Sequence, residues 1–293
     1  MKIPTPQGEL VGTITIPANV SSMPAVLIVA GSGPTDRDGN DARYGLRTDL
    51  YKRLAEDLTK AGIASLRYDK RGVGASTSAE ALEVPLVLDT YVQDVVLALQ
   101  AAEAVRGINS VFLLGHSEGG LLSILAAHQH PPRGLILLES QGRSMAKLIS
   151  EQLHAAPIAD NLKLRADEIM VELQQGRSVT DIPTGLQALF APNLQAYLKS
   201  ILSVDPGREI AHLRIPTLII QGTTDLQTSM QDAQHLHAGN PDATVVVLPG
   251  ANHVLRDVSA DRVPNLATYS KPDLPLDPAL LPALVSFIQT HAP

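Results

Sequence analysis

Residues 110–129 have the sequence SVFLLGHSEGGLLSILAAHQ, and this stretch decides the fold. Its apolar run at 111–114 is typical of a buried strand, and the apolar segment with small residues after Gly120 predicts a helix. Between them lies a glycine–x–serine–x–glycine motif, residues 115–119, in a strand–turn–helix setting. A sharp turn of this kind holds the Ser117 hydroxyl out of the sheet, at the positive end of the helix, where it can act as a nucleophile.

Strands and helices alternate on both sides of this motif. Residues 1–17 turn at Gln7-Gly8 and predict an antiparallel hairpin at one edge of a sheet. Further strands are expected at 25–30, 63–68, 134–139, 215–222 and 244–248, and helices at 48–61, 89–105, 229–238 and 278–290. Residues 141–213 contain no strand-like run and predict several helices broken by prolines, whereas 259–275 predicts a proline-rich loop. The alternation indicates a mostly parallel sheet covered by helices on both faces.

Three residues with complementary chemistry each follow a predicted strand: Ser117, Asp225 and His253. The carboxyl ends of parallel strands meet at one edge of a sheet, so we expect the three side chains to lie close together. A serine hydroxyl is a weak nucleophile that needs a base, and the base needs an orienting acid. The chain order of nucleophile, acid and base is that of one known arrangement of the catalytic triad.

Two of these assignments have rivals. Glu139 also follows a strand and is the alternative acid, although it could instead hold a neighbouring segment or contact substrate. Three other histidines could replace His253 as the base, but none of them follows the last strand: His116, His128 and His130. Asp225 and His253 therefore remain the preferred pair.

An oxyanion hole needs preorganised N–H donors, and we expect two backbone groups to provide them. One is the N–H of Glu118, directly after the nucleophile, and the other that of Ser32 in the glycine-rich loop 31–40. Four further residues are candidates for the substrate pocket: Gly31, Gly33, His116 and Glu139. The charged segment 36–38 and Arg71 are expected to stabilise loops through ion pairs.

The composition excludes several classes of function. A net charge of −7 argues against a nucleic-acid or anionic-membrane partner, and no apolar stretch approaches the length of a membrane span. There is no cysteine, no HExxH motif and no phosphate-binding GxxxxGK[ST] motif, so neither a metal nor a cofactor is expected. The beginning of the chain lacks an apolar signal region, which predicts a cytoplasmic location, or a periplasmic one if a signal peptide has been removed. The oligomeric state is not indicated.

Several segments resemble known families. Residues 115–120, 222–225 and 250–253 resemble the three catalytic signatures of the α/β-hydrolase superfamily, and 69–76 (DKRGVGAS) resembles its loop after the preceding strand. The loop 31–40 (GSGPTDRDGN) and the GHSEGG turn are similar to bacterial carboxylesterases of the EstD type, a serine-aminopeptidase-like (Hydrolase_4-like) group. One difference is Ala30, where these proteins often have a histidine that supports the oxyanion loop.

The resemblance implies the α/β class and an α/β-hydrolase fold, with a mostly parallel eight-stranded sheet and helices on both faces. Residues 1–140 and 214–293 would form the core, and 141–213 a helical cap inserted after the sixth strand. The implied activity is that of a serine carboxylesterase, which hydrolyses small to medium acyl esters through an acyl-enzyme. Thioesterase or aminopeptidase activity with the same triad is an alternative, as is a non-catalytic ligand-binding protein with this fold.

Overall fold

The computed structural model describes residues 1–77 and 86–293, and its centre is one sheet of eight strands. The strand order is β1-β2-β6-β3-β7-β8-β9-β10. β1 (Lys2–Thr5) and β2 (Gly8–Thr15) form the predicted antiparallel hairpin, and β2 pairs antiparallel with β6 (Ala64–Tyr68). The remaining strands run parallel to β6: β3 (Met23–Val29), β7 (Ile108–His116), β8 (Gly134–Leu138), β9 (Thr217–Gly222) and β10 (Thr244–Leu248). The predicted eight-stranded, mostly parallel sheet is confirmed.

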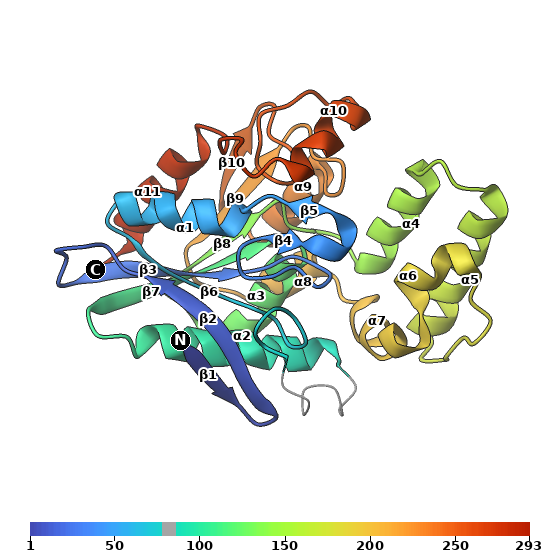
Figure 1. The fold of residues 1–293 in the computed structure, drawn as a ribbon, viewed down its shortest axis with the longest axis horizontal. Coiled ribbons are helices and arrows are strands. Elements are labelled where there is room, and N and C mark those ends of the chain that lie inside the picture. The colour runs from blue at the N-terminus through green and yellow to red at the C-terminus, as the bar shows by residue number, and fades with distance from the viewer. Residues whose placement is uncertain (78–85) are drawn as a thin grey trace.

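Helices cover both faces of the sheet (Figure 1). α1 (Leu50–Lys60) and α11 (Leu280–His291) pack on one face. Four helices pack on the other: α2 (Leu88–Glu103), α3 (Glu118–Gln129), α8 (Pro206–Ile210) and α9 (Met230–Gly239). Within β3, Ile28 belongs to the apolar cluster under α1, whereas Leu27 and Val29 belong to the opposite cluster. Because both faces are buried, the central strands are continuously apolar, which explains why they were visible in the sequence.

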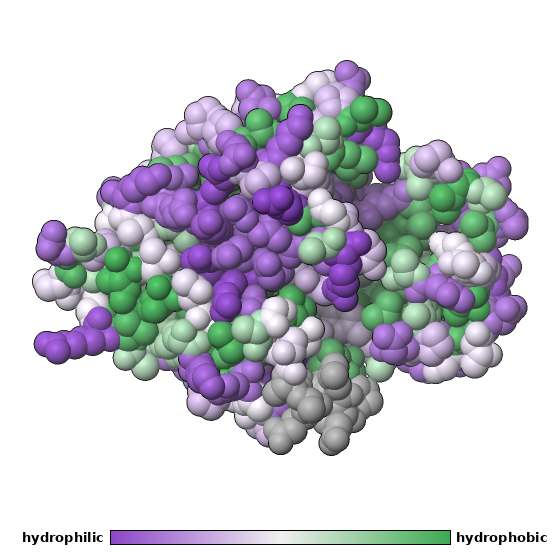
Figure 2. All heavy atoms as spheres, in the orientation of Figure 1, coloured by the Kyte–Doolittle hydropathy of each residue, from purple (hydrophilic) through white to green (hydrophobic). Residues whose placement is uncertain are grey.

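Residues 141–213 are helical, as predicted. They contain α4 (Met145–Ala155), α5 (Asp160–Gln174), α6 (Gln187–Phe190) and α7 (Gln195–Ile201), before α8 returns to the core. α4 to α7 surround an apolar cluster of their own and stand to one side of the sheet, at the right of Figure 1. Figure 2 shows a hollow between this group and the core, with apolar residues on its helical side. The role of the segment as a cap stays a prediction.

Two short structures were missed by sequence reasoning. β4 (Asn40–Asp41) and β5 (Leu46–Arg47) form a small antiparallel pair around the 3-10 helix η1 (Ala42–Tyr44). The prediction of a loop over 259–275 was wrong in part, because α10 (Arg262–Ala267) and η5 (Thr268–Ser270) lie within it. α10 is too short to show a helical apolar period, and it is held by tertiary hydrogen bonds, such as that from the Asn265 side chain to the carbonyl of Thr224 at 2.9 Å.

Among the described residues, no helix is long and apolar enough to cross a membrane.

Candidate active site

Ser117 is the single residue between β7 and α3. Its φ of 56° and ψ of −124° place it in a region that L-amino acids rarely adopt, at a cost of roughly 1–3 kcal/mol. Two glycines make the turn possible, because a Cβ atom on Gly115 would overlap the carbonyl of Gly119, and one on Gly119 would overlap that of Val29. The Ser117 N–H donates to the carbonyl of Leu138 at 2.9 Å and so ties the turn to β8. The predicted strand–turn–helix setting of the motif is present.

His253 follows β10 and lies beside this turn. Its Nδ1 atom is 2.7 Å from Oδ2 of Asp225. A proton on Nδ1, shared with this carboxylate, leaves Nε2 free to accept the proton of a serine hydroxyl. The side chains of His253 and Ser117 line the same pocket, although no direct hydrogen bond joins them among the described residues. Catalytic hydrogen bonds are often long before substrate binds, so this geometry is compatible with a triad.

Asp225 is buried and strongly hydrogen-bonded. Oδ1 accepts the backbone N–H groups of Gln227 at 2.6 Å and Thr228 at 3.1 Å, and Oδ2 accepts the Thr228 hydroxyl at 2.7 Å. Burial tends to raise the pKa of Asp225, but the charge and hydrogen bond of His253 outweigh burial and hold this pKa at about 2. Asp225 is therefore an ionised acid in contact with His253.

Glu139 lies behind Asp225, away from the pocket. Its side chain is fully buried and accepts the N–H of Gly222 at 2.8 Å and the side-chain amide of Gln221. Burial, together with the neighbouring charge of Asp225, raises the pKa of Glu139 well above its usual range. The raised pKa favours a protonated Glu139, which could donate its proton to the neighbouring carboxylate of Asp225. The contact to His253 Nδ1 is made by Asp225.

The pocket beside Ser117 is a cavity of about 90 Å³. Its walls come from the loop after β3, through Thr35 and Thr48, and from Gln227 and Tyr269. Ser32 lines the cavity too. Of the four predicted pocket residues, Gly31 and His116 line it, whereas Gly33 and Glu139 do not. No lining residue comes from 141–213, so the described helices of that segment do not shape this cavity.

A hydrogen-bond chain connects the glycine-rich loop to His253. His116 Nε2 lies 2.8 Å from the carbonyl oxygen of His253, which can only accept, so Nε2 carries a proton. Nδ1 of His116 then accepts from the Tyr51 hydroxyl at 2.9 Å, and the Tyr51 oxygen accepts the Gly31 N–H at 3.0 Å. Burial, with His253 nearby, lowers the pKa of His116 to about 3. His116 is thus neutral and links two loops, and because both of its ring nitrogens are engaged in these hydrogen bonds, neither is free to take a proton from Ser117.

Charged groups near the site hold loops together, as expected. Arg71 makes a bidentate pair with Asp94, with both distances 2.6 Å. The loop 31–49 is tied to β6 and the turn after it, because Arg67 of β6 pairs with Asp38 at 2.9 Å and the Arg37 N–H donates to Asp69 at 2.8 Å.

Asn252 was missed by sequence reasoning. It is fully buried, and its side-chain oxygen accepts the N–H groups of Val254 and Arg256, which shapes the turn that carries His253. Its position next to His253 was the only signal. Tyr51 was missed too, because its place in α1 looks like an ordinary core position.

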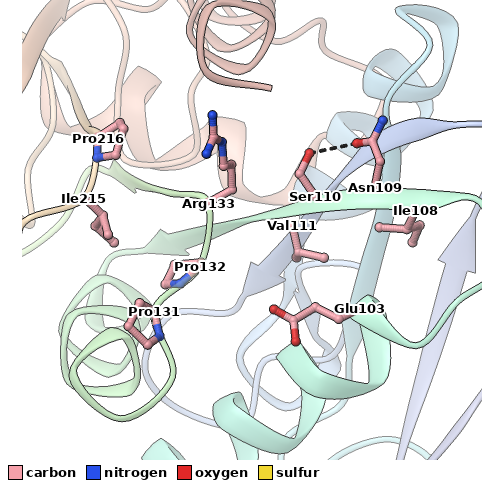
Figure 3. A pocket seen from close by; sticks show the side chains of 10 residues that line it. All are labelled: Glu103, Ile108, Asn109, Ser110, Val111, Pro131, Pro132, Arg133, Ile215 and Pro216. Carbon is pink, nitrogen blue, oxygen red and sulfur yellow. Dashed lines mark hydrogen bonds between the residues drawn. The ribbon is translucent and has the colours of Figure 1, made fainter. Parts of the chain in front are cut away.

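A larger depression, of about 490 Å³, lies at the other edge of the sheet. Its residues precede or begin β7, β8 and β9, and Figure 3 shows Arg133, Pro216 and Asn109 around it. Ser117 follows the opposite end of β7, so this depression is separate from the pocket beside Ser117. Of the described residues, Glu103 and Arg133 are the charged ones that line it, and no group of chemically complementary side chains among them converges there.

Comparison with known proteins agrees with the fold. The family model of Hydrolase_4, described as "Serine aminopeptidase, S33", matches residues 43–189, which is half of the chain. The chain belongs to this family. The esterase EstD of Thermotoga maritima is 27% identical over 252 residues, which cover 84% of this chain and 58% of EstD. The chain therefore spans less than two thirds of that relative.

Two further proteins are similar to this chain. The monoglyceride lipase of Rattus norvegicus is 27% identical over 255 residues, covering 80% of this chain and 77% of the lipase. Among solved structures, the α/β hydrolase GrgF from Penicillium sp. sh18 matches with a TM-score of 0.63 and 18% identity, over 100% of this chain and 98% of GrgF. The likeness to GrgF confirms the predicted α/β-hydrolase fold.

Proposed function

We propose that this Hydrolase_4 protein is a serine carboxylesterase that acts on esters with small to medium acyl groups. Ser117 is the nucleophile, His253 the general base and Asp225 the acid that orients it. The observation that carries the proposal is the meeting of a strained Ser117 and an Asp225-bonded His253 in one pocket. The names of EstD and of the monoglyceride lipase support ester chemistry.

The reaction begins when the Ser117 oxygen attacks the ester carbonyl while His253 Nε2 takes the hydroxyl proton. The resulting tetrahedral intermediate collapses, its bond to the alcohol oxygen breaks, and His253 gives its proton to the leaving alcohol. Water then attacks the acyl-Ser117 ester with His253 again as the base, releasing the carboxylic acid and restoring the serine hydroxyl. The ionised Asp225 stabilises the imidazolium formed in both steps.

Two N–H groups are placed to stabilise the negative oxygen of the intermediate. Glu118 is the first residue of α3, and the first N–H groups of a helix have no acceptor within it. Ser32 lies in the loop that lines the pocket, and its N–H has no acceptor among the described residues. Preorganised donors of this kind contribute strongly to acyl transfer.

The pocket favours a short acyl chain. A cavity of about 90 Å³ lies far below the ~300–1,000 Å³ of sites for drug-sized ligands. A larger alcohol portion would extend toward the hollow beside α4 to α7 (Figure 2). In this proposal residues 141–213 act as a cap over that hollow, and residues 1–140 and 214–293 form the core.

Aminopeptidase activity, which the family description suggests, is the second candidate. An aminopeptidase must accept a charged amino group, and no Asp or Glu lines the described pocket beside Ser117. Ester substrates therefore fit the pocket better. Neither a metal nor a cofactor enters the proposed chemistry, and a cytoplasmic location stays a prediction.

A panel of substrates tests the proposal. p-Nitrophenyl esters from acetate to palmitate, an acyl thioester and aminoacyl anilides would be compared with wild type and Ser117→Ala. Short aryl esters should be the best substrates, and loss of the nucleophile typically lowers kcat by about 10⁶-fold. A fluorophosphonate probe should label Ser117 in the wild type. Rapid hydrolysis of the anilides with weak ester activity would favour an aminopeptidase, and Ser117→Ala within tenfold of wild type would exclude the triad.

A further inference from the structure

Lys70 is a buried lysine beside the glycine-rich loop, outside the groups assigned so far. It follows the strand end of β6, its exposed fraction is 5%, and its ammonium group donates to the carbonyl oxygen of Gly31. Among the described residues, no carboxylate oxygen lies within 4.0 Å of its nitrogen. Burying an ammonium group without a close counter-charge costs free energy, so such a position calls for an explanation.

The geometry of one peptide group suggests that explanation. The Gly31 carbonyl and the Ser32 N–H belong to the same planar trans peptide and point in opposite directions. Ser32 lines the pocket, whereas Lys70 does not. Fixing the carbonyl toward Lys70 therefore directs the Ser32 N–H toward the pocket. Gly31 also packs directly on the nucleophile, because a Cβ atom on it would lie 3.1 Å from Ser117 Cβ.

We propose that Lys70 is a positioning residue for the oxyanion hole: it fixes the Gly31–Ser32 peptide so that the Ser32 N–H faces the oxyanion formed at Ser117. The inference rests on the proposed function, since it needs an acyl transfer at Ser117. Tyr51 holds Gly31 as well, by accepting its N–H. Ala30 has no side-chain donor or acceptor that could hold this loop, so the position of Gly31 depends on Tyr51 of α1 and on Lys70 of the loop after β6.

The charge of Lys70 adds to its orienting role. A hydrogen bond to an amide oxygen polarises the amide and strengthens its N–H as a donor. A buried positive charge one peptide away also favours a negative oxygen, because the low dielectric screens it little. Burial lowers the pKa of Lys70, while the charges of Glu118 and Asp41 act in the opposite direction and favour the ammonium form.

The test compares Lys70→Met with wild type and with Lys60→Met, the same change at an exposed lysine of α1. Losing a direct oxyanion donor costs about 10²–10³-fold in kcat, and misplacing one should cost less, about 10–100-fold, with KM nearly unchanged. Affinity for a trifluoromethyl ketone, which forms a tetrahedral adduct with the serine, should fall by a similar factor. Lys60→Met should match wild type in all three measurements.

Two results would overturn the inference: kcat and ketone affinity of Lys70→Met within threefold of wild type, or a change confined to KM. If Lys70→Met does not fold, Lys70→Gln keeps a donor but removes the charge, and it should show the same kind of loss at smaller size. If the Lys70→Gln variant then has the kcat and ketone affinity of the wild type, the inference is overturned. Failure of the proposed function has a different signature, because the wild type itself would neither hydrolyse esters nor be labelled at Ser117.

Discussion

Exchanging each of two neighbouring carboxyl groups for an amide tests the assignment of the triad acid. In Asp225→Asn, the backbone N–H groups of Gln227 and Thr228 bind the oxygen end of the new amide, since they now bind Oδ1. The amide nitrogen then faces Nδ1 of His253, a donor placed where an acceptor is needed. The imidazole is forced into the tautomer with its proton on Nε2, which cannot accept the proton of Ser117. We expect kcat to fall by about 10⁴-fold, equivalent to ~5.5 kcal/mol.

Glu139→Gln should behave differently, because the raised pKa of Glu139 favours its protonated, neutral form. A glutamine is neutral like the protonated acid, its oxygen can accept the Gly222 N–H, and its nitrogen can donate to Asp225. The negative charge on Asp225 and its contact with His253 are retained. We expect kcat to fall by less than about tenfold, since no group at the reacting atoms is lost.

The assay is hydrolysis of p-nitrophenyl acetate or butyrate at saturating concentration by purified, folded variants. Active-site titration of each variant corrects for inactive protein, and circular dichroism checks the fold. A larger loss in Glu139→Gln than in Asp225→Asn would refute this reasoning and move the orienting acid to Glu139. Equal losses would show that the two carboxyl groups act as one unit.

Three further predictions follow from buried contacts. The raised pKa of Glu139 in the folded chain means that unfolding releases its proton above pH ~4.5, so wild-type stability should fall relative to Glu139→Gln as pH rises, by up to ~1.4 kcal/mol per pH unit. Urea titrations from pH 4 to 8 measure this, and a difference in unfolding free energy between the two proteins that stays constant with pH would contradict the prediction. Tyr51→Phe leaves the buried Gly31 N–H and His116 Nδ1 unpaired and should cost about 1–3 kcal/mol of unfolding free energy, measured the same way. Gly119→Ala forces a Cβ atom onto the carbonyl of Val29 and should destabilise by ~1–3 kcal/mol or more, whereas unchanged stability and activity would show that the turn can relax.

The sheet and the nucleophile turn could be predicted because their physics leaves local traces. Strands buried on both faces become continuous apolar runs, and the crossing of β7 and α3 requires glycine at 115 and 119. The order of Ser117, Asp225 and His253 could be used because each residue follows the end of a strand within about five residues. These features depend on residues close together in the chain or on a simple topological rule.

The rest depends on contacts between distant segments, which leave no local pattern. β4 and β5 are two residues long, and α10 is held by tertiary bonds from Asn265. Glu139 resembled a second acid in the sequence, but whether a carboxyl group is ionised depends on its burial and its neighbours. The residues that line the pocket beside Ser117 come from segments as far apart in the chain as Thr35 and Tyr269, and no local pattern marks them as neighbours.

The sheet fixes the positions of the site residues, because the backbone hydrogen bonds between neighbouring strands continue for one residue beyond the ends of β7 and β8. The N–H of Ser117 donates to Leu138 of β8, and the N–H of Glu139 donates to Ile220 of β9. Both residues then turn away with positive φ, 56° and 43°, a conformation that costs free energy and needs firm neighbours. The nucleophile and the carboxyl group behind the triad acid are therefore fixed relative to one another by strand register. A site anchored in this way keeps its reacting atoms in place while the helices α4 to α7 vary, so sequence changes in those helices should alter which substrates bind more than how they are cleaved.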